Sequence, residues 1–318
     1  MPLLDVRRLT VDFVTSEGAM LRAVEDVGLT LERGEALGIV GESGCGKTTA
    51  MLALMRLLPA AGRISDGEML FDGEDLFELN SDEYRARRWH DLSMVFQGAM
   101  NALNPVRSVG DQIREAINVH LRLSRDAAEA RTKELLELVG IPAWRAAQYP
   151  HQYSGGMRQR AMIAMALACN PQLVIADEPT TALDVMIQAQ IMELLERLRR
   201  ELNLALILVT HDLGVVAETC QKVLVMYGGR VAEYGAGREI FLAPKHPYTQ
   251  RVLRAFPDIA RRGAELASIP GSPPQLSDLP HGCRFHPRCA LAVDRCRSET
   301  PQLRLLGRDQ WVACHVAE

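Results

Sequence analysis

Long apolar runs, an excess of positive charge and internal repeats are all missing from this chain of 318 residues. The longest apolar stretches, such as Leu204–Val209, are only as long as a strand, so no segment is predicted to span a membrane. The first residues, MPLLDVRRLTVDF, have no apolar region behind their charges, which predicts that there is no signal peptide. The formal net charge of −4 argues against nucleic acid as the main partner. We therefore expect a soluble protein whose work at a membrane, if it has any, depends on partner proteins.

Short apolar runs alternate with amphipathic stretches along the middle of the chain. Ala182–Leu202, for example, places Ile187, Ile191 and Leu194 at helical spacing. The runs are predicted to be buried parallel strands: Ala36–Val40, Leu92–Phe96, Leu173–Ala176 and Leu204–Val209. This alternation predicts an α/β fold with helices covering a largely parallel sheet.

Three other regions depart from that alternation. Residues 1–32 alternate between apolar and polar and predict antiparallel strands. Residues 101–147 are mostly helical in pattern, including Asp126–Leu138, and are predicted to be an inserted helical subdomain. The Pro-rich stretch 269–276 is typical of a linker and precedes a Cys-rich tail. Because there is no repeat, one nucleotide-binding domain is expected.

The clearest motif is Gly41-Glu-Ser-Gly-Cys-Gly-Lys47-Thr48, which follows a predicted strand and opens a helix. Glycines let backbone N–H groups converge on phosphate oxygens, and the helix N-terminus adds a favourable dipole. Lys47 is predicted to reach the β- and γ-phosphates, and the Thr48 hydroxyl to bind Mg²⁺.

Polar residues also follow the other predicted strands. Asp177 and Glu178 end the strand that begins at Leu173, where an acidic residue can hold Mg²⁺ and a second can polarise the attacking water. Gln97 and His211 follow two further strands. Ligands of open parallel sheets bind outside the carboxyl ends of the strands, so these side chains and Lys47 are expected at one edge.

A Ser-Gly-Gly sequence at residues 154–156 starts a helical pattern and lies shortly before Asp177. A hydroxyl and bare N–H groups at a helix start are suited to phosphate. With these motifs together, the chain resembles an ABC-type ATPase from about residue 3 to 258. That resemblance implies an α/β P-loop NTPase (RecA-like) core, a helical subdomain at about 98–158, an N-terminal antiparallel sheet, and a closed sandwich of two such domains around ATP and Mg²⁺.

The resemblance implies a role for each matching residue. Glu178 would be the catalytic carboxylate, with Gln97 in the Q-loop and His211 as the switch histidine. Thr48, Gln97 and Asp177 would hold Mg²⁺. Ser154, Gly155 and Gly156 would serve the opposite ATP site, and Asp184 would lie in the D-loop; here Tyr153 and Met157 flank the signature in place of the commoner residues. The ATP-binding residues expected are Phe13, Gly41, Glu42, Ser43, Gly44, Cys45, Gly46, Lys47, Thr48 and Thr49.

Further stretches resemble one subgroup, the oligopeptide, dipeptide and nickel importer ATPases. They are SGGMRQR, the stretch Gln97–Pro105, KHPYT at 245–249 and the Cys-rich tail. The Met after SGG resembles the first, or D-type, of two paired ATPase subunits. The resemblance implies a peripheral ATPase on the cytoplasmic face of the membrane that energises import of peptides or similar solutes. Its partners would be a second, F-type ATPase, two permeases and an external solute-binding protein, and the residues after Gln97 would face the permease.

Four of the seven cysteines crowd the predicted extension, residues 259–318. In a cytosolic protein such a cluster suggests a metal. The spacing C-x5-C-x6-C-x17-C lacks the short knuckles of structural zinc sites, and four thiolates can equally hold a [4Fe–4S] cluster. The resemblance favours the cluster, because some members of the subgroup carry one; zinc and no metal remain alternatives. The proposed ligands are Cys283, Cys289, Cys296 and Cys314.

Two other classes of ABC protein fit the sequence less well. A DNA-repair or chromosome-organising ATPase needs a long coiled coil between the phosphate loop and the signature, and no long heptad run is present. A ribosome-acting protein usually fuses two nucleotide domains and carries basic patches, and neither is seen. The transporter ATPase is therefore the favoured function.

Overall fold

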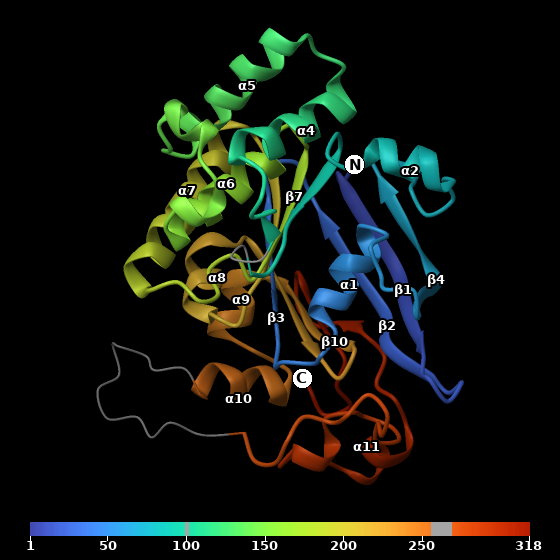
Figure 1. Ribbon diagram of the computed structural model, residues 1–318. Coiled ribbons are helices and arrows are strands. Elements are labelled where there is room, and N and C mark those ends of the chain that lie inside the picture. Colours follow the sequence, from blue (N-terminus) through green and yellow to red (C-terminus); the bar gives the residue numbers. More distant parts are fainter. Residues whose placement is uncertain (99–101, 256–268) are drawn as a thin grey trace. The chain divides into compact units, whose positions relative to one another are not determined.

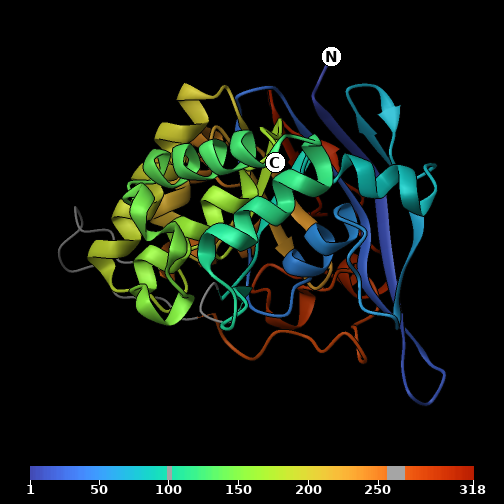
Figure 2. The same ribbon diagram turned by 45° about the horizontal axis from the view of Figure 1, so that its top comes forward.

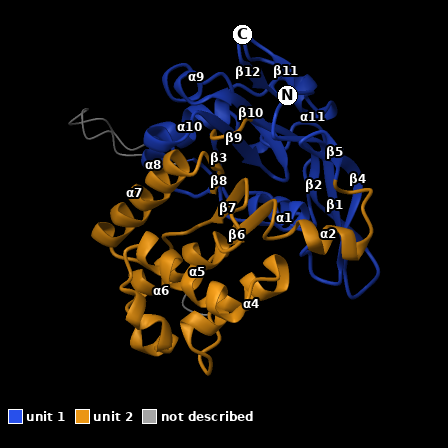
Figure 3. Cartoon of the chain, turned by 90° about the horizontal axis from the view of Figure 1, so that it is seen from above, with its two compact units in different colours: residues 1–31, 36–75, 209–318 blue, residues 32–35, 76–208 orange. Residues whose placement is uncertain are grey.

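The computed structural model describes residues 1–98, 102–255 and 269–318. These residues divide into two compact units, coloured separately in Figure 3. Unit 1 comprises residues 1–31, 36–75 and 209–318, and unit 2 comprises residues 32–35 and 76–208. Unit 1 therefore brings both ends of the chain together, whereas unit 2 is almost one continuous segment.

An antiparallel sheet forms the first part of unit 1. Its strand order is β2-β1-β4-β5, and each neighbouring pair is antiparallel. The long β1 and β2 ribbon is blue in Figures 1 and 2. Val6, Leu9 and Val11 of β1 are buried, as the sequence alternation requires, so the antiparallel strands predicted in residues 1–32 are confirmed. The strands are β1 (Leu4–Val14), β2 (Met20–Leu31), β4 (Gly62–Phe71) and β5 (Glu74–Asp75).

A second group of strands in unit 1 has the order β11-β12-β10-β9-β3. β3 is parallel to β9, and the remaining pairs are antiparallel. The C-terminal tail supplies β11 and β12, so it extends this sheet by pairing β12 with β10. The strands are β3 (Ala36–Val40), β9 (Lys222–Tyr227), β10 (Arg230–Ala236), β11 (Arg304–Leu305) and β12 (Gln310–Val312).

The helices of unit 1 are short. The first follows β3 directly after the glycine-rich loop, as predicted, and the last lies in the tail, drawn in orange to red in Figure 1. They are α1 (Lys47–Leu54), α8 (Leu213–Thr219), α9 (Gly237–Leu242), α10 (Pro247–Ala255), α11 (Asp294–Ser298) and the 3-10 turn η3 (His286–Arg288).

Unit 2 contains the strands β8-β7-β6 in that order, with β6 parallel to β7. They are β6 (Leu92–Val95), β7 (Leu173–Asp177) and β8 (Ala205–Val209), of which Val209 itself is counted in unit 1. All are completely buried, as their apolar sequences predict. The four predicted strands, including β3, are thus confirmed to within one residue at each end.

Helices make up most of the rest of unit 2, and α4 to α7 are labelled in Figure 1. They are α2 (Ser81–Arg87), α4 (Val109–Leu121), α5 (Arg125–Leu138), α6 (Gly155–Ala166), α7 (Val185–Glu201), and the 3-10 turns η1 (Ala143–Ala147) and η2 (Pro150–Gln152). The helix predicted from Ala182 begins only at Val185, because the Asp184 side chain caps it by accepting a hydrogen bond from the N–H of Ile187 at 3.0 Å. Across the described residues, no helix combines the length and hydropathy that a membrane crossing needs.

Candidate functional site

The loop from Gly41 to Gly46 joins β3 to α1 in unit 1. Gly41 has φ 151° and Gly46 has φ 101°, conformations that side chains rarely adopt. A Cβ at Gly41 would lie 2.3 Å from the carbonyl oxygen of Met226 in β9, so only glycine fits there. Gly46 is also the N-cap of α1 and has no side chain to occupy the helix end. The loop therefore presents a helix N-terminus, a standard anion-binding feature.

Lys47 is buried at the start of α1, with 7% of its surface exposed. Its Nζ donates hydrogen bonds to the carbonyl oxygens of Gly41 at 2.7 Å and Glu42 at 3.1 Å, and it lies 3.8 Å from the Cys45 Sγ. Burial raises the pKa of Cys45, so this thiol is not the anion that the lysine pairs with. The ammonium folds back over its own loop, and together with the helix N-terminus it makes a positively charged cradle that fits the phosphates of a nucleotide.

Two predicted site residues meet at the ends of β6 and β7 in unit 2. Val95 pairs with Ala176, and Gln97 and Glu178 each lie two residues beyond that pair. The Gln97 Nε2 donates a hydrogen bond to the Glu178 Oε2 at 2.6 Å, and the Thr181 hydroxyl donates to the same oxygen at 2.9 Å. The contact joins residues far apart in sequence, as expected where parallel strands end at one edge.

Asp177 and Glu178 differ sharply in their surroundings. Asp177 is the last residue of β7 and only 1% exposed, whereas Glu178 stands where the chain leaves the strand with φ 45°, an uncommon value for a residue other than glycine. Such conformations are costly and concentrate at functional sites. The turn holds the Glu178 carboxylate against Gln97, while Asp177 stays within the sheet edge.

The Ser-Gly-Gly motif begins α6 in unit 2. Ser154 is the N-cap, and its exposed hydroxyl accepts a hydrogen bond from the N–H of Met157 at 3.3 Å. A Cβ at Gly156 would lie 2.7 Å from a methyl carbon of Ile187 in α7, so glycine lets these two helices approach closely. The motif therefore exposes a helix N-terminus with a serine hydroxyl beside it. Asp184, which caps α7, is also exposed.

Two further predicted residues, Phe13 and His211, lie in unit 1. Phe13 is half-buried in β1, and its ring lies against Gly62 of β4, where a Cβ would come within 2.9 Å of it. His211 is exposed and follows β8, just before Asp212, which caps α8 by accepting hydrogen bonds from Gly214 and Val215. This cap sets where the chain turns after His211.

The prediction of a metal centre in the tail is wrong. Within residues 1–98, 102–255 and 269–318, no group of three or more His, Cys, Asp or Glu side chains is arranged to hold a metal ion, so the predicted [4Fe–4S] cluster has no support. The four residues proposed as ligands are free cysteines: Cys283, Cys289, Cys296 and Cys314. Burial raises the pKa of Cys283 to about 11.

The tail is instead held by ordinary packing and hydrogen bonds. β12 pairs with β10 through Glu233 and Val312, and Phe285 is 2% exposed. Its ring lies 5.2 Å from that of Tyr227 and 5.4 Å from that of Tyr248, measured between centroids. The sequence argument considered only the cysteines of the tail, whereas the tail shares the core of β9, β10 and α10.

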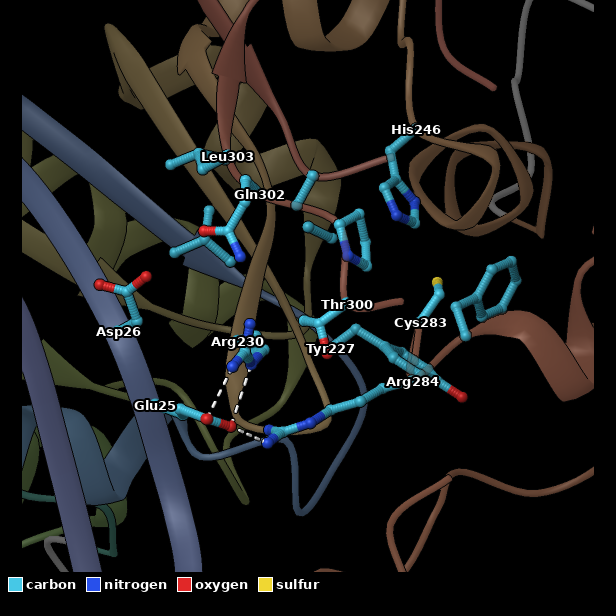
Figure 4. Close-up of a pocket in the computed structure, with 15 residues that line it drawn as sticks. Glu25, Asp26, Tyr227, Arg230, His246, Cys283, Arg284, Thr300, Gln302 and Leu303 are labelled. Carbon is cyan, nitrogen blue, oxygen red and sulfur yellow. Dashed lines mark hydrogen bonds and ion pairs between the residues drawn. The ribbon is translucent and has the colours of Figure 1, made fainter. Parts of the chain in front are cut away.

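A pocket of about 50 Å³ lies elsewhere in unit 1, between β2, the β9–β10 hairpin and the tail (Figure 4). Its polar centre is Glu25, which accepts hydrogen bonds from Arg230 and Arg284. The hydrogen bond from Arg230 lowers the pKa of Glu25, and burial lowers that of Arg284 to about 10. This volume holds only a few waters. The pocket is therefore a structural ion cluster, and no predicted nucleotide residue lines it.

Sequence reasoning missed two residues that touch the phosphate loop. Arg288 of the tail binds the Glu42 carboxylate, and the Tyr248 hydroxyl accepts a hydrogen bond from the Glu42 N–H. Arg288 stands directly before Cys289 in the tail motif, but that motif was interpreted through its cysteines alone. An acidic residue inside a loop that should attract phosphate was the signal that could have prompted a search for a cation.

Two family profiles match this chain. The profile described as "ABC transporter" matches residues 24–181, which include the glycine-rich loop, Gln97, the Ser-Gly-Gly motif and Glu178. The profile described as "Oligopeptide/dipeptide transporter, C-terminal region" matches residues 232–296, which include Arg288 and three of the tail cysteines.

Curated relatives match over almost the whole length. The dipeptide transport ATP-binding protein DppD of Escherichia coli K12 is 49% identical over 317 residues, which are 99% of this chain and 97% of the relative. The oligopeptide transport ATP-binding protein OppD of Salmonella typhimurium LT2 is 50% identical over 301 residues, or 94% of this chain and 89% of that protein.

A solved structure shares the fold. The ATP-binding cassette MJ0796, solved as a dimer in a post-hydrolysis state with ADP and Pi, is 29% identical, with a TM-score of 0.66. The match covers 74% of this chain and 99% of the cassette. This likeness and the profile match confirm the predicted fold class, an α/β P-loop core with a helical subdomain and an N-terminal antiparallel sheet.

Proposed function

This chain belongs to the family of ABC transporter ATP-binding subunits of dipeptide and oligopeptide importers, and on that premise we propose how its residues energise peptide uptake. The protein is an ABC-type ATPase that converts ATP and water to ADP and phosphate. In our proposal the cycle drives import of dipeptides, oligopeptides or similar small solutes. The observation that carries it is the cradle of Gly41, Gly46 and Lys47, because it supplies a helix N-terminus and a buried ammonium at one place.

ATP binds this cradle in our proposal. The residues Gly41 to Thr49 surround its phosphates, and Lys47 pairs with the β- and γ-phosphates once it exchanges its two carbonyl partners for them. Phe13, half-buried in β1, stacks on the adenine. Mg²⁺ would neutralise phosphate charge, and the residues proposed to hold it are Thr48, Gln97 and Asp177.

Glu178 orients the attacking water and accepts its proton. The hydrogen bonds from Gln97 and Thr181 to one carboxylate oxygen support this role, because they fix the orientation of the carboxylate. His211 acts as the switch residue that links this step to the γ-phosphate. The hydrogen bond from Gln97 to Glu178 makes Gln97 the link between the nucleotide and the permease in this proposal.

Two ATPase subunits share each site in this proposal. Ser154 is exposed at the start of α6, directly before Gly155 and Gly156, and this helix start suits the γ-phosphate of an ATP held by the other subunit. Asp184 lies at the exposed start of α7, suited to the same interface. The second subunit is an F-type paralogue, and both dock on two permeases that receive solute from an external binding protein.

The protein works on the cytoplasmic face of the membrane, and the stretch that follows Gln97 contacts the permeases. Residues 99–101 of that stretch lie outside the described residues, as does the proposed boundary between an ATP-binding domain (1–258) and a C-terminal extension (259–318). The profile match at residues 232–296 supports assigning the extension to the peptide-transporter type. DNA repair and ribosome-associated activity receive no support, because the relatives DppD and OppD are both named as transport proteins.

The test uses the chain purified with its permeases and paired ATPase in lipid vesicles. Glu178→Gln should keep MgATP binding and lower both ATP turnover and peptide uptake by about 10²–10⁴-fold, the usual effect of removing a general base. Glu193→Gln, which makes the same change at an exposed position of α7, is the matched control. Turnover within about threefold of the wild type would remove Glu178 from this role.

A further inference from the structure

A carboxylate sits inside the phosphate-binding loop and is paired with the C-terminal tail. The Nη1 of Arg288 donates to one Glu42 oxygen at 2.6 Å, and its Nη2 donates to the other at 3.0 Å. This is the bidentate geometry of a strong guanidinium–carboxylate pair. The two residues are 246 positions apart, so the contact joins the first and last parts of the chain within unit 1.

Arg288 is fixed independently of Glu42. Its Nε donates to the carbonyl oxygen of Pro270 at 2.8 Å, and its Nη1 donates to the Tyr227 hydroxyl at 3.2 Å. Only 6% of its side chain is exposed. Burial lowers the pKa of Arg288, but the hydrogen bonds to Glu42 and Tyr227 outweigh that effect and the net pKa is raised. The guanidinium is therefore a permanent, preoriented cation.

The backbone of Glu42 is held by the same region. Its N–H donates to the Tyr248 hydroxyl at 3.0 Å, and the Tyr248 ring packs on Tyr227 with centroids 4.6 Å apart. Tyr248 is completely buried. Both the main chain and the side chain of this loop residue are thus positioned by groups outside the loop.

The charge of Glu42 is unfavourable where it stands. A loop that binds phosphates gains from positive potential, and an unpaired carboxylate within it would repel the anionic ligand. Arg288 cancels that charge and turns the carboxylate into an anchor for the loop.

We propose that Arg288 is a positioning residue for ATP binding, which neutralises Glu42 and ties the phosphate loop to the C-terminal tail. The inference rests on the proposed function, since it needs the loop to bind ATP. It predicts that removing Arg288 lowers the affinity for MgATP because the unpaired negative charge of Glu42 then repels the nucleotide.

The experiment measures MgATP binding to the full chain by calorimetry, with thermal unfolding as a check on folding. Arg288→Met keeps an apolar stem over Tyr227 and removes the charge; we expect the Kd for MgATP to rise about tenfold, and less at high salt because screening weakens the repulsion. Adding Glu42→Gln to that variant should recover most of the lost affinity. Arg288→Lys keeps the charge but not the bidentate hydrogen bonds, so we expect it to lose clearly less affinity than Arg288→Met.

Arg304→Met is the matched control, because Arg304 braces the tail through the carbonyl oxygens of Cys314 and Ala317 without touching the phosphate loop. It should leave the affinity unchanged. An Arg288→Met loss that Glu42→Gln does not reverse, or that Arg288→Lys shares, overturns the proposal. If the wild-type chain binds no MgATP, the proposed function is overturned. If the wild type binds MgATP and the Arg288→Met variant binds it equally well, only this inference is overturned.

Discussion

The phosphate loop and the C-terminal tail of unit 1 are built in opposite ways. In the loop, strand, glycines, lysine and helix follow one another in sequence, and Lys47 finds its carbonyl partners at Gly41 and Glu42. In the tail, Phe285 packs on Tyr227 and Tyr248, and β12 pairs with β10. Local sequence therefore suffices to recognise the loop, whereas the tail is stable only through contacts with distant segments. Interpreting the tail by its own residues led to a metal centre that the described residues do not form.

The largest expected effect tests the chemistry of the loop. Lys47→Ala should weaken MgATP binding by about 10²–10³-fold, because a buried ammonium that pairs with phosphate is lost. Titration of the full chain with MgATP measures this. Lys133→Ala, which removes an exposed lysine paired with Glu129 on α5, is the control and should bind normally. Equal affinity of the Lys47 variant and the wild type would show that the loop is not the ATP site.

Removing an aromatic ring tests how the tail is held. Phe285→Ala should lower the free energy of unfolding of unit 1 by about 3 kcal/mol, since it leaves a cavity between Tyr227 and Tyr248. Chemical denaturation measures the change, and limited proteolysis should show earlier cleavage within residues 269–318. Leu291→Ala, at a 56% exposed position of the same tail, should change little. Matching effects from the two variants would contradict the shared core.

The free energy of unfolding of unit 1 should depend on pH through His246, which lies between α9 and α10. His246 is 3% exposed, its Nδ1 accepts a hydrogen bond from the N–H of Tyr248 at 3.0 Å, and burial lowers its pKa to about 4. In the unfolded chain the His246 side chain takes up a proton near pH 6.5, whereas in the folded chain it stays neutral until about pH 4. The contribution of neutral His246 to the free energy of unfolding is therefore complete above pH 6.5 and is lost as the pH falls toward 4. The total loss should be about 3 kcal/mol.

Unfolding measured between about pH 4 and pH 7 tests this linkage. His246→Gln should show a flatter pH dependence than the wild type over that range. His281→Gln alters an exposed histidine and should keep the wild-type slope. A His246→Gln slope that equals the wild-type slope would rule the linkage out.

The smallest effect compares two glycines of the loop. Gly41→Ala should destabilise the protein by about 2 kcal/mol more than Gly44→Ala, because its Cβ would meet the Met226 carbonyl oxygen. A Cβ at Gly44 would meet nothing within 4 Å, so only its positive φ of 79° is strained, at about 1 kcal/mol. Thermal unfolding of both variants checks this. Equal destabilisation would mean that Met226 does not confine the loop.

Much of the fold and site was predictable because the signals are short-range. Apolar runs predicted β3, β6, β7 and β8, and the parallel pairing of β6 with β7 brings Gln97 to Glu178 as expected. The predicted start of α7 is three residues too early, since apolar periodicity does not show where Asp184 caps the helix. Glu42 was expected in the ATP site, but nothing near it in sequence indicates that a carboxylate there is neutralised.

The sequence by itself determined where phosphate can bind, because a strand, a glycine-rich turn and a helix in succession form the anion-binding geometry locally. Folding in three dimensions decided which charges surround that loop and what holds the tail. The Glu42–Arg288 pair spans 246 residues, and the aromatic core around Phe285 draws on β9 and α10. Hydrogen bonds and packing act over a few ångströms whatever the distance in sequence, so such contacts exist only once the sheets have brought their partners together.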